Sequence, residues 1–164
     1  MSYLPWIPII TSGWEDSDYR NLVTHQISEE QQGVRKNYIL VSKESRKKIG
    51  AGCLTAIDYK ESSCNLGLII ESAYFDQKFG TECIYQLSVI AFEELVLKRV
   101  TFETLNTNKP MIGWLEKVGK AKLINSNEKL VIGGVSYDMV KYEIDDVRWI
   151  QVSKQSLLDK LNRQ

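Results

Sequence analysis

The sequence has no excess of charge of either sign, because its 21 basic and 21 acidic side chains cancel. Proteins that bind nucleic acid or a membrane surface mainly by electrostatic attraction carry a surplus of lysine and arginine. The overall charge therefore gives no reason to expect either partner, and we expect no nucleic acid and no membrane.

Long apolar runs are also missing. None approaches the roughly 20 residues that a membrane-spanning helix needs. The first residues, Met1 to Trp6, have no basic segment ahead of their apolar side chains, so they do not resemble a secretory signal. We therefore expect a soluble, cytoplasmic protein.

Cysteine and histidine are scarce. The three cysteines, Cys53, Cys64 and Cys83, are widely spaced and form no C-x-x-C pair, so the sequence suggests neither a disulfide framework nor a zinc site, and we expect no metal. Small buried apolar residues are the expected role of all three. His25 is the single histidine and has no evident cysteine or serine partner, which argues against a Cys-His or Ser-His hydrolase.

What is present is enough for a core. The 164 residues are 43% hydrophobic, which suits one domain over residues 1–164. Residues 1–33 combine a short apolar run, limited to a sheet edge by Pro5 and Pro8, with helical patterns that begin after Trp14 and at Ser28. Residues 150–164 read as a C-terminal helical tail.

The middle of the chain predicts a mixed α/β fold. Three successive β-favouring runs, 38–41, 49–59 and 65–70, are joined by polar turns and predict antiparallel strands. A helix with an apolar stripe follows from Thr81, and a strand comes at 100–105. The order strand, helix, strand implies a right-handed crossover and one parallel pair.

The last third of the chain predicts a helix and further strands. Asn108 followed by Pro110 is typical of a helix start. Strands are expected at 122–124 and 129–132, and Gly133-Gly134 predicts a hairpin that leads to a strand over 135–144.

The stretch 74–87 is the one around which these elements are arranged. It reads as a loop that reaches Gly80 and enters a helix directly. The first turn of a helix has free backbone N–H groups and the positive end of the helix dipole, which together suit a phosphate or another anion. An ordinary strand-to-helix connection would have the same appearance.

Several strings in this order resemble the GNAT N-acetyltransferases, and within them the branch that acetylates ribosomal-protein N-termini and related amines. They are Leu66-Gly67-Leu68-Ile69-Ile70, Tyr74 to Glu82, Ala91-Phe92-Glu93-Glu94-Leu95 with Lys98-Arg99-Val100, Asn108 to Gly119, and Tyr137-Asp138-Met139-Val140 with Arg148-Trp149. The resemblance covers roughly residues 49–149. It implies a mostly antiparallel, twisted sheet of six to seven strands with flanking helices, and a splay between the family's fourth and fifth strands.

The resemblance implies acetyl-CoA as co-substrate, bound in that splay. The expected cofactor-binding residues comprise the fourth-strand backbone, the pyrophosphate loop with the helix start, and an asparagine: Leu68, Ile69, Ile70, Gln77, Lys78, Phe79, Gly80, Thr81, Glu82 and Asn108. Gly67 would let the cofactor approach the strand backbone. Asn108 has a second possible role, that of helix N-cap, and the two roles are compatible.

The partner implied by the resemblance is an amine acceptor, either a small molecule or a protein N-terminus. The protein is expected to be a monomer or a homodimer.

The sequence departs from the family pattern at four positions. Phe75 stands where the pyrophosphate loop of the family usually has arginine or glutamine, and Lys78 stands where that loop has its first glycine. If that glycine is needed for a positive φ, Lys78 is strained by about 1 kcal/mol or more, although its ammonium could meet a phosphate. Leu115 stands where many members have a tyrosine that acts as the acid for the leaving thiolate. Met111 stands where the ribosomal branch often has a serine.

The candidate catalytic bases are Glu71, at the end of the fourth strand, and Glu103, on the fifth. Each alone is also compatible with a solvated surface carboxylate.

The function implied by the resemblance is direct transfer of an acetyl group from acetyl-CoA to a primary amine. The alternatives are a catalytically inactive GNAT-fold binding or assembly module, with a filled cleft, and an unrelated α/β binding domain, with a fully paired sheet.

Overall fold

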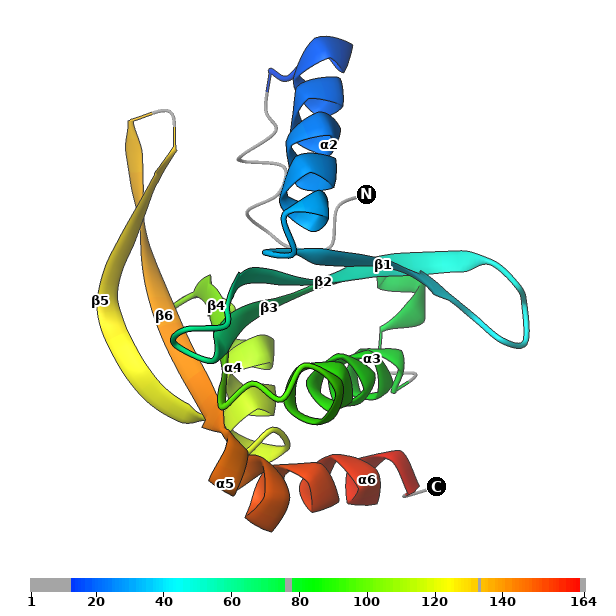
Figure 1. The fold of residues 1–164 in the computed structure, drawn as a ribbon, viewed down its shortest axis with the longest axis vertical. Helices are drawn as coiled ribbons and strands as arrows, with labels where there is room; N and C mark the ends of the chain where they lie inside the picture. Colours follow the sequence, from blue (N-terminus) through cyan, green and yellow to red (C-terminus); the bar gives the residue numbers. More distant parts are fainter. Residues whose placement is uncertain (1–12, 76–77, 133, 163–164) are drawn as a thin grey trace.

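The computed structural model describes residues 13–75, 78–132 and 134–162. Its strands are β1 (Lys36–Val41), β2 (Lys48–Asp58), β3 (Ser63–Ile70), β4 (Arg99–Leu105), β5 (Lys122–Ile132) and β6 (Val135–Asp145). They form one sheet in the order β1-β2-β3-β4-β6-β5, as Figure 1 shows. The strands that we expected to be the family's fourth and fifth are β3 and β4. The mixed, mostly antiparallel sheet is confirmed.

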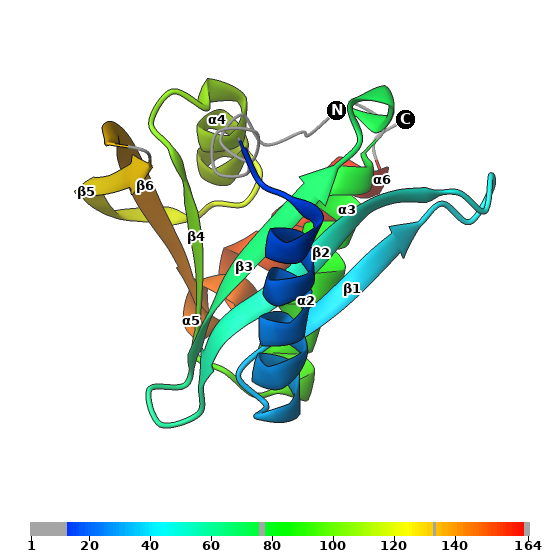
Figure 2. The same ribbon diagram turned by 90° about the horizontal axis from the view of Figure 1, so that it is seen from above.

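The helices lie on both sides of this sheet. Figure 1 shows α2 on one side and α3 and α6 on the other, and in Figure 2 α2 crosses in front of β2 and β3. The helices and turns are α2 (Asp16–Gln31), η1 (Ser72–Tyr74), α3 (Phe79–Val89) with its π-helical extension η2 (Ile90–Glu94), α4 (Lys109–Lys117), α5 (Asp146–Arg148), the π-helical turn η3 (Trp149–Ser153) and α6 (Lys154–Asn162).

The splay between β3 and β4 is confirmed. These two strands are parallel and pair at three positions, from Ser63 with Arg99 to Asn65 with Thr101. Beyond that level β3 stays paired with β2 as far as Ile70, and β4 stays paired with β6 as far as Leu105. The two halves of the sheet therefore diverge, while each keeps its own antiparallel partner.

The core lies on the α3 side of the sheet. Alternate residues of the central strands point there, since successive side chains of a strand face opposite ways. Leu54 of β2 and Phe102 of β4 are buried, together with Leu157 of α6 and Trp149 of η3. The Trp149 ring stacks on Phe92 with centroids 5.2 Å apart, so the C-terminal segment shares the core of the sheet and α3.

Two local predictions are wrong. Ser28 begins no second helix, because α2 continues to Gln31, where the left-handed Gly33 (φ 76°) lies just beyond the end. The N-cap is instead Glu15, whose side chain and that of Asp18 form a capping box. Residues 122–132 form one strand rather than two, since the Asn125 turn signal produces an irregular register against β6 and no break.

The apolar run at 6–10, which we expected to be a strand, lies outside the described residues, as does Gly133 of the predicted hairpin turn. The hairpin itself is confirmed by the antiparallel pairing of β5 and β6. Within the described ranges, no helix is both long and apolar enough to cross a bilayer, and no group of side chains is arranged to hold a metal ion.

Candidate functional site

The backbone of β3 has one edge without a strand partner inside the splay. Leu68, Ile69 and Ile70, the predicted cofactor-binding residues of this strand, pair with β2 on their other edge. The N–H and C=O groups of an unpaired strand edge are available to an extended ligand that bonds as an added strand. Residues 66–70 therefore provide a site for the amides of a linear molecule.

Gly67 has a packing role in addition to the predicted one. A Cβ at this position would lie 2.9 Å from the Sγ of Cys53, its partner on β2. That is closer than Cβ atoms come to other heavy atoms, so a larger residue would require the Cys53 side chain to turn away. The glycine thus leaves room for the Cys53 thiol, whether or not a ligand approaches here.

The helix α3 begins without a side-chain cap. Its N-cap residue is Lys78, which makes no capping hydrogen bond with its side chain. The first N–H groups of a helix have no partner within it, so Phe79, Gly80 and Thr81 supply donors at the positive end of the α3 dipole. Glu82 lies in the same turn. Gln77, the other predicted residue of this loop, lies outside the described residues.

Lys78 adopts the left-handed conformation, with φ 64° and ψ −5°. This is the backbone shape for which a glycine is the usual choice, and the family pattern has a glycine here. Its Nζ donates a hydrogen bond of 3.2 Å to the carbonyl of Leu161 near the end of α6. The ammonium is therefore directed at the C-terminal end of α6, and it would have to leave that carbonyl in order to bind a phosphate through the same hydrogen.

A hydrogen bond joins α4 to the start of α3. The indole Nε1 of Trp114 donates to Thr81 Oγ1 at 3.0 Å, and the Thr81 side chain is buried. This contact fixes the position of α4 beside the uncapped helix terminus. No pattern in the sequence indicated it, since the two residues lie in separate helices.

Asn108 is the N-cap of α4, as predicted. Its Oδ1 accepts from the backbone N–H of Met111 at 3.4 Å, and its Nδ2 donates to Thr104 Oγ1 at 3.0 Å. One amide hydrogen and one lone pair remain for a ligand. Asn108 follows the end of β4 at Leu105, on the side where β3 and β4 are no longer paired, and this position is compatible with the predicted cofactor contact.

The two candidate bases lie on the same face of the sheet but at different levels. Residues at even spacing share a face, so Glu71 points with Ile69, and Glu103 with Thr101, toward the α2 side. At about 3.3 Å per residue, Glu71 lies about 20 Å beyond Asn65, whereas Glu103 lies about 7 Å beyond Thr101. The two carboxylates are thus about 13 Å apart along the strands. A single reacting amine cannot contact both.

Glu103 has a cationic partner that sequence reasoning missed. The Nζ of Lys141, its cross-strand neighbour on β6, lies 2.8 Å from Glu103 Oε1. This hydrogen bond raises the pKa of Lys141, and the charges of Glu103, Glu128 and Glu143 add to the effect. One carboxylate therefore contacts the Lys141 ammonium, and two more act on it through their charge. The register of β6 against β4, which places Lys141 opposite Glu103, cannot be read from either strand alone.

The positions where relatives have a hydroxyl group hold apolar side chains. Leu115 is fully buried, and Met111 packs against the core.

The buried hydroxyl of Tyr142 donates to Glu116 Oε1 at 2.6 Å, and burial together with this contact raises the pKa of Tyr142 to about 12. Desolvation likewise raises the pKa of Cys64 to about 12 and that of Cys83 to about 11, so neither thiol is a nucleophile near neutral pH.

The comparisons with known proteins agree with this geometry. A family model described as an acetyltransferase (GNAT) domain matches residues 1–120. A comparison with curated proteins finds no match.

Solved acetyltransferases share the fold. A variant of the spermidine N-acetyltransferase SpeG from Vibrio cholerae is 17% identical, with a TM-score of 0.73 over 82% of this chain and 79% of that one. A probable acetyltransferase is 19% identical, with a TM-score of 0.69 over 78% of this chain and 71% of that one. A dodecameric form of the Vibrio cholerae enzyme is 17% identical, with a TM-score of 0.72 over 82% and 78% of the two chains.

Proposed function

The chain belongs to the acetyltransferase (GNAT) domain family, and we propose that it transfers the acetyl group of acetyl-CoA directly to a primary amine. The observation that carries the proposal is the splay of β3 from β4 beside the uncapped start of α3. This arrangement offers strand amides and helix N–H groups to one extended, anionic molecule.

The cofactor would lie along β3. The pyrophosphate would accept hydrogen bonds from the N–H groups of Phe79, Gly80 and Thr81, where the helix dipole contributes about 0.3 to 1 kcal/mol. From there the pantetheine arm would pass Ile70 and Leu68 toward the level at which the strands meet. The thioester would thus lie at the narrow end of the splay, far from the pyrophosphate.

This direction distinguishes the two candidate bases. Glu71 directly precedes the turn η1 that leads to α3, at the pyrophosphate end, whereas Glu103 is two residues from the last β3–β4 pair. We assign proton removal from the acceptor ammonium to Glu103, directly or through a water molecule. The neutral amine then attacks the thioester carbonyl carbon, and the new C–N bond replaces the C–S bond. The nitrogen gives up a second proton as the sulfur takes one up, so coenzyme A leaves as its thiol.

The acceptor in this proposal carries positive charge. The carboxylates of Glu103, Glu128 and Glu143 all act on the Lys141 ammonium, so acidic side chains gather around the proposed base. An ammonium would be attracted to this surface before it loses its proton. A small polyamine, such as the spermidine named for the Vibrio cholerae enzyme, and the N-terminus of a ribosomal protein are the two acceptors to compare.

The test measures binding and transfer separately. Isothermal titration with acetyl-CoA should show binding below millimolar concentration, and the absence of binding there would overturn the proposal. Mass spectrometry should then detect a mass gain of one acetyl group on spermidine or on a peptide with a free N-terminus. If the cofactor binds but no amine among a panel of both classes is acetylated, the direct transfer step is wrong.

A further inference from the structure

The carboxylate of Glu103 is paired with a cation of the protein itself. Lys141 Nζ lies 2.8 Å from Glu103 Oε1, and the two side chains are 28% and 33% exposed. Among the residues that the structure describes, this is the one ion pair that Glu103 forms. The carboxylate that we assign as the base therefore holds an ammonium before any acceptor arrives.

The pair lies at the level where the splay has opened. Lys141 is opposite Glu103 on β6, and Glu103 is two residues beyond Thr101, where the pairing of β4 with β3 ends. Lys141 thus approaches the carboxylate from the β6 side, and the thioester would lie on the β3 side. An acceptor ammonium that enters the splay at this level meets a carboxylate that is already bound to another ammonium.

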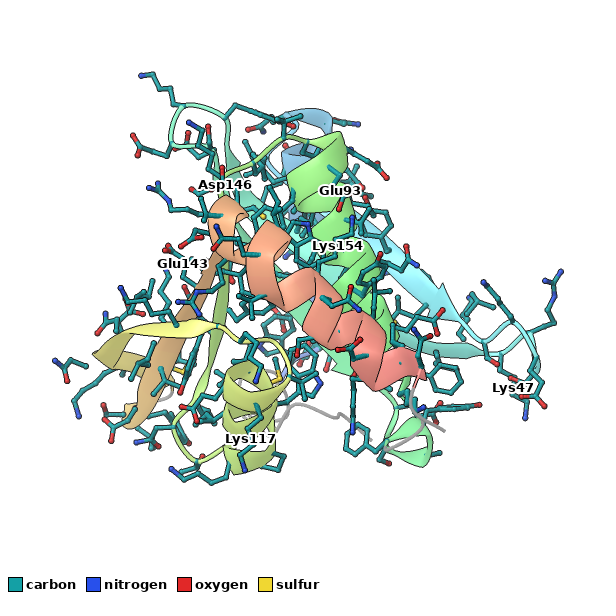
Figure 3. The ribbon with its side chains drawn as sticks, turned by 90° about the horizontal axis from the view of Figure 1, so that it is seen from below. Lys47, Glu93, Lys117, Glu143, Asp146 and Lys154 are labelled. Carbon is teal, nitrogen blue, oxygen red and sulfur yellow. The ribbon has the colours of Figure 1, made fainter. Side chains whose placement is uncertain are left out.

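Other carboxylates lie near enough to receive Lys141 if it leaves Glu103. The hydrogen bond to Glu103 raises the pKa of Lys141, and the charges of Glu128 and Glu143 add to the effect, so the side chain stays cationic at neutral pH. Glu143 is two residues along β6 and on the same face, and Figure 3 shows it toward the α5 end of the strand. The flexible stem of a lysine allows its ammonium to turn toward such a neighbour while the backbone stays in place.

We propose that Lys141 is a specificity-determining residue that competes with the ammonium of the acceptor for Glu103, an inference that rests on the proposed function. In the free enzyme Lys141 holds the place of the acceptor's charge. A protonated amine replaces it, and the Lys141 ammonium turns toward Glu143 and Glu128. An amine that arrives without a charge gains too little from the carboxylate to displace a lysine, so the site selects acceptors that are protonated before they bind.

Steady-state kinetics of Lys141→Met test the inference, because methionine keeps an unbranched stem but has no ammonium. For spermidine, or for the peptide with a free N-terminus if that is the acceptor acetylated, KM should fall by about two- to fivefold, the factor that corresponds to a partly exposed ion pair. The value of kcat should stay within about twofold, since a change in KM alone reports binding and not chemistry. Lys141→Arg keeps a cation at Glu103, so its KM should be no lower than that of the wild-type protein.

The matched control is Lys154→Met, which also removes one ammonium and frees one carboxylate. Lys154 Nζ lies 2.7 Å from Glu93 Oε1, and these side chains are 37% and 42% exposed. Figure 3 shows Lys154 and Glu93 together at α6 and the end of the α3 segment, apart from Glu143 on β6. Because the lost charge is remote from the splay, this variant should keep the wild-type KM.

The outcomes separate the inference from the proposed function. A KM that is unchanged or raised in Lys141→Met, or lowered equally in Lys154→Met, overturns the inference and leaves the proposed function standing. A tenfold loss of kcat in Lys141→Met also overturns it, because Lys141 would then hold Glu103 in position for catalysis. If the wild-type protein acetylates no amine, both are wrong.

Discussion

At the scale of single residues, the pair Glu103 and Lys141 carries most of the proposed chemistry. Their 2.8 Å contact keeps the carboxylate beside a cation on the face where the amine would arrive. An incoming ammonium can take the place of Lys141 at this carboxylate, because the two cations have the same chemistry. The pair therefore presents a site that already accommodates a positive charge.

We expect Glu103→Gln to lower kcat by about 10²- to 10⁴-fold, the usual contribution of a general base. Steady-state rates with acetyl-CoA and a saturating amine measure this. Glu143→Gln, which removes a carboxylate from the same face, should lower kcat less than about threefold because Glu143 is on β6 opposite Thr101, at a level where β4 is still paired with β3 and the splay has not opened. A larger loss in Glu71→Gln than in Glu103→Gln would contradict the assignment.

The thiols give a prediction on pH. Burial, assisted by the neighbouring charge of Glu82, raises the pKa of Cys83 to about 11 from an ordinary value of 9. In the native protein Cys83 should therefore react slowly with a thiol reagent at pH 8, and its rate should increase as the pH rises through about 11. Because the raised pKa belongs to the folded state, its contribution to stability is complete below pH 9 and is lost as the pH rises toward 11.

Labelling followed by mass spectrometry measures this at Cys83, and urea-unfolded protein, in which the thiol is exposed, serves as the control. Rapid modification of Cys83 in the folded state at pH 8 would show that the pKa of this thiol is not raised.

Lys78 allows the cost of its backbone shape to be measured. Lys78→Ala and Lys78→Gly both remove the ammonium that bonds to Leu161, but the alanine keeps a Cβ at φ 64°. A Cβ in the left-handed region costs about 1 to 2 kcal/mol, so the glycine variant should have a free energy of unfolding about 1 kcal/mol above that of the alanine variant. Urea denaturation compares the two, and equal stabilities would show that the start of α3 relaxes to another shape.

At the scale of elements, a hydrogen bond with α3 adds to the core packing that holds α4 in place. Asn108 starts α4 by a local cap, which the sequence predicted, whereas the bond from Trp114 to Thr81 fixes where the helix lies. The same distinction applies to β5. Its turn signals at Asn125 are local, but pairing with β6 keeps the strand continuous through them.

Thr81→Val should therefore loosen α4 from α3. The substitution keeps the shape of the side chain but leaves the Trp114 N–H without its acceptor, which costs about 1 to 3 kcal/mol. Urea unfolding followed by tryptophan fluorescence measures the loss. Thr107→Val, at an exposed position of the turn before α4, should change the free energy of unfolding by less than about 0.5 kcal/mol. If both variants have the same stability, the contact does not hold α4.

At the scale of the whole molecule, the C-terminal segment belongs to the core of the sheet. Trp149 and Leu157 are buried, with exposed fractions of 1% and 0%, and α6 packs along α3. Folding of the last elements is thus coupled to the crossover helix that begins at the candidate site.

Leu157→Ala should destabilise the entire protein by about 2 to 5 kcal/mol, the usual cost of a cavity in a core. Thermal or urea unfolding should remain one cooperative transition at a lower midpoint. Val152→Ala, where the side chain is 41% exposed, should cost less than about 1 kcal/mol. A separate early transition for α6, with the rest of the molecule unchanged, would show that the segment behaves as an independent tail.

The sequence by itself determined the order of the elements and most of their local boundaries. The Asn108 cap, the apolar stripe of α3 and the alternation in the strands act over a few residues, so they can be read from the chain. The crossover from β3 to β4 follows from that order, because a strand, a helix and a strand close in one hand. The location of the candidate cofactor site followed from these features together with the resemblance of residues 49–149 to the GNAT family.

The tertiary structure decided the relations between distant elements. The cross-strand register that places Lys141 against Glu103, the separation of Glu71 from Glu103, and the contact of Lys78 with Leu161 all depend on how β6 and α6 pack. A shift of register by one residue reverses which face each side chain occupies without changing the pattern of either strand. Packing over long sequence distances selects among such arrangements, and for that reason the charges around the site could be read only from the fold.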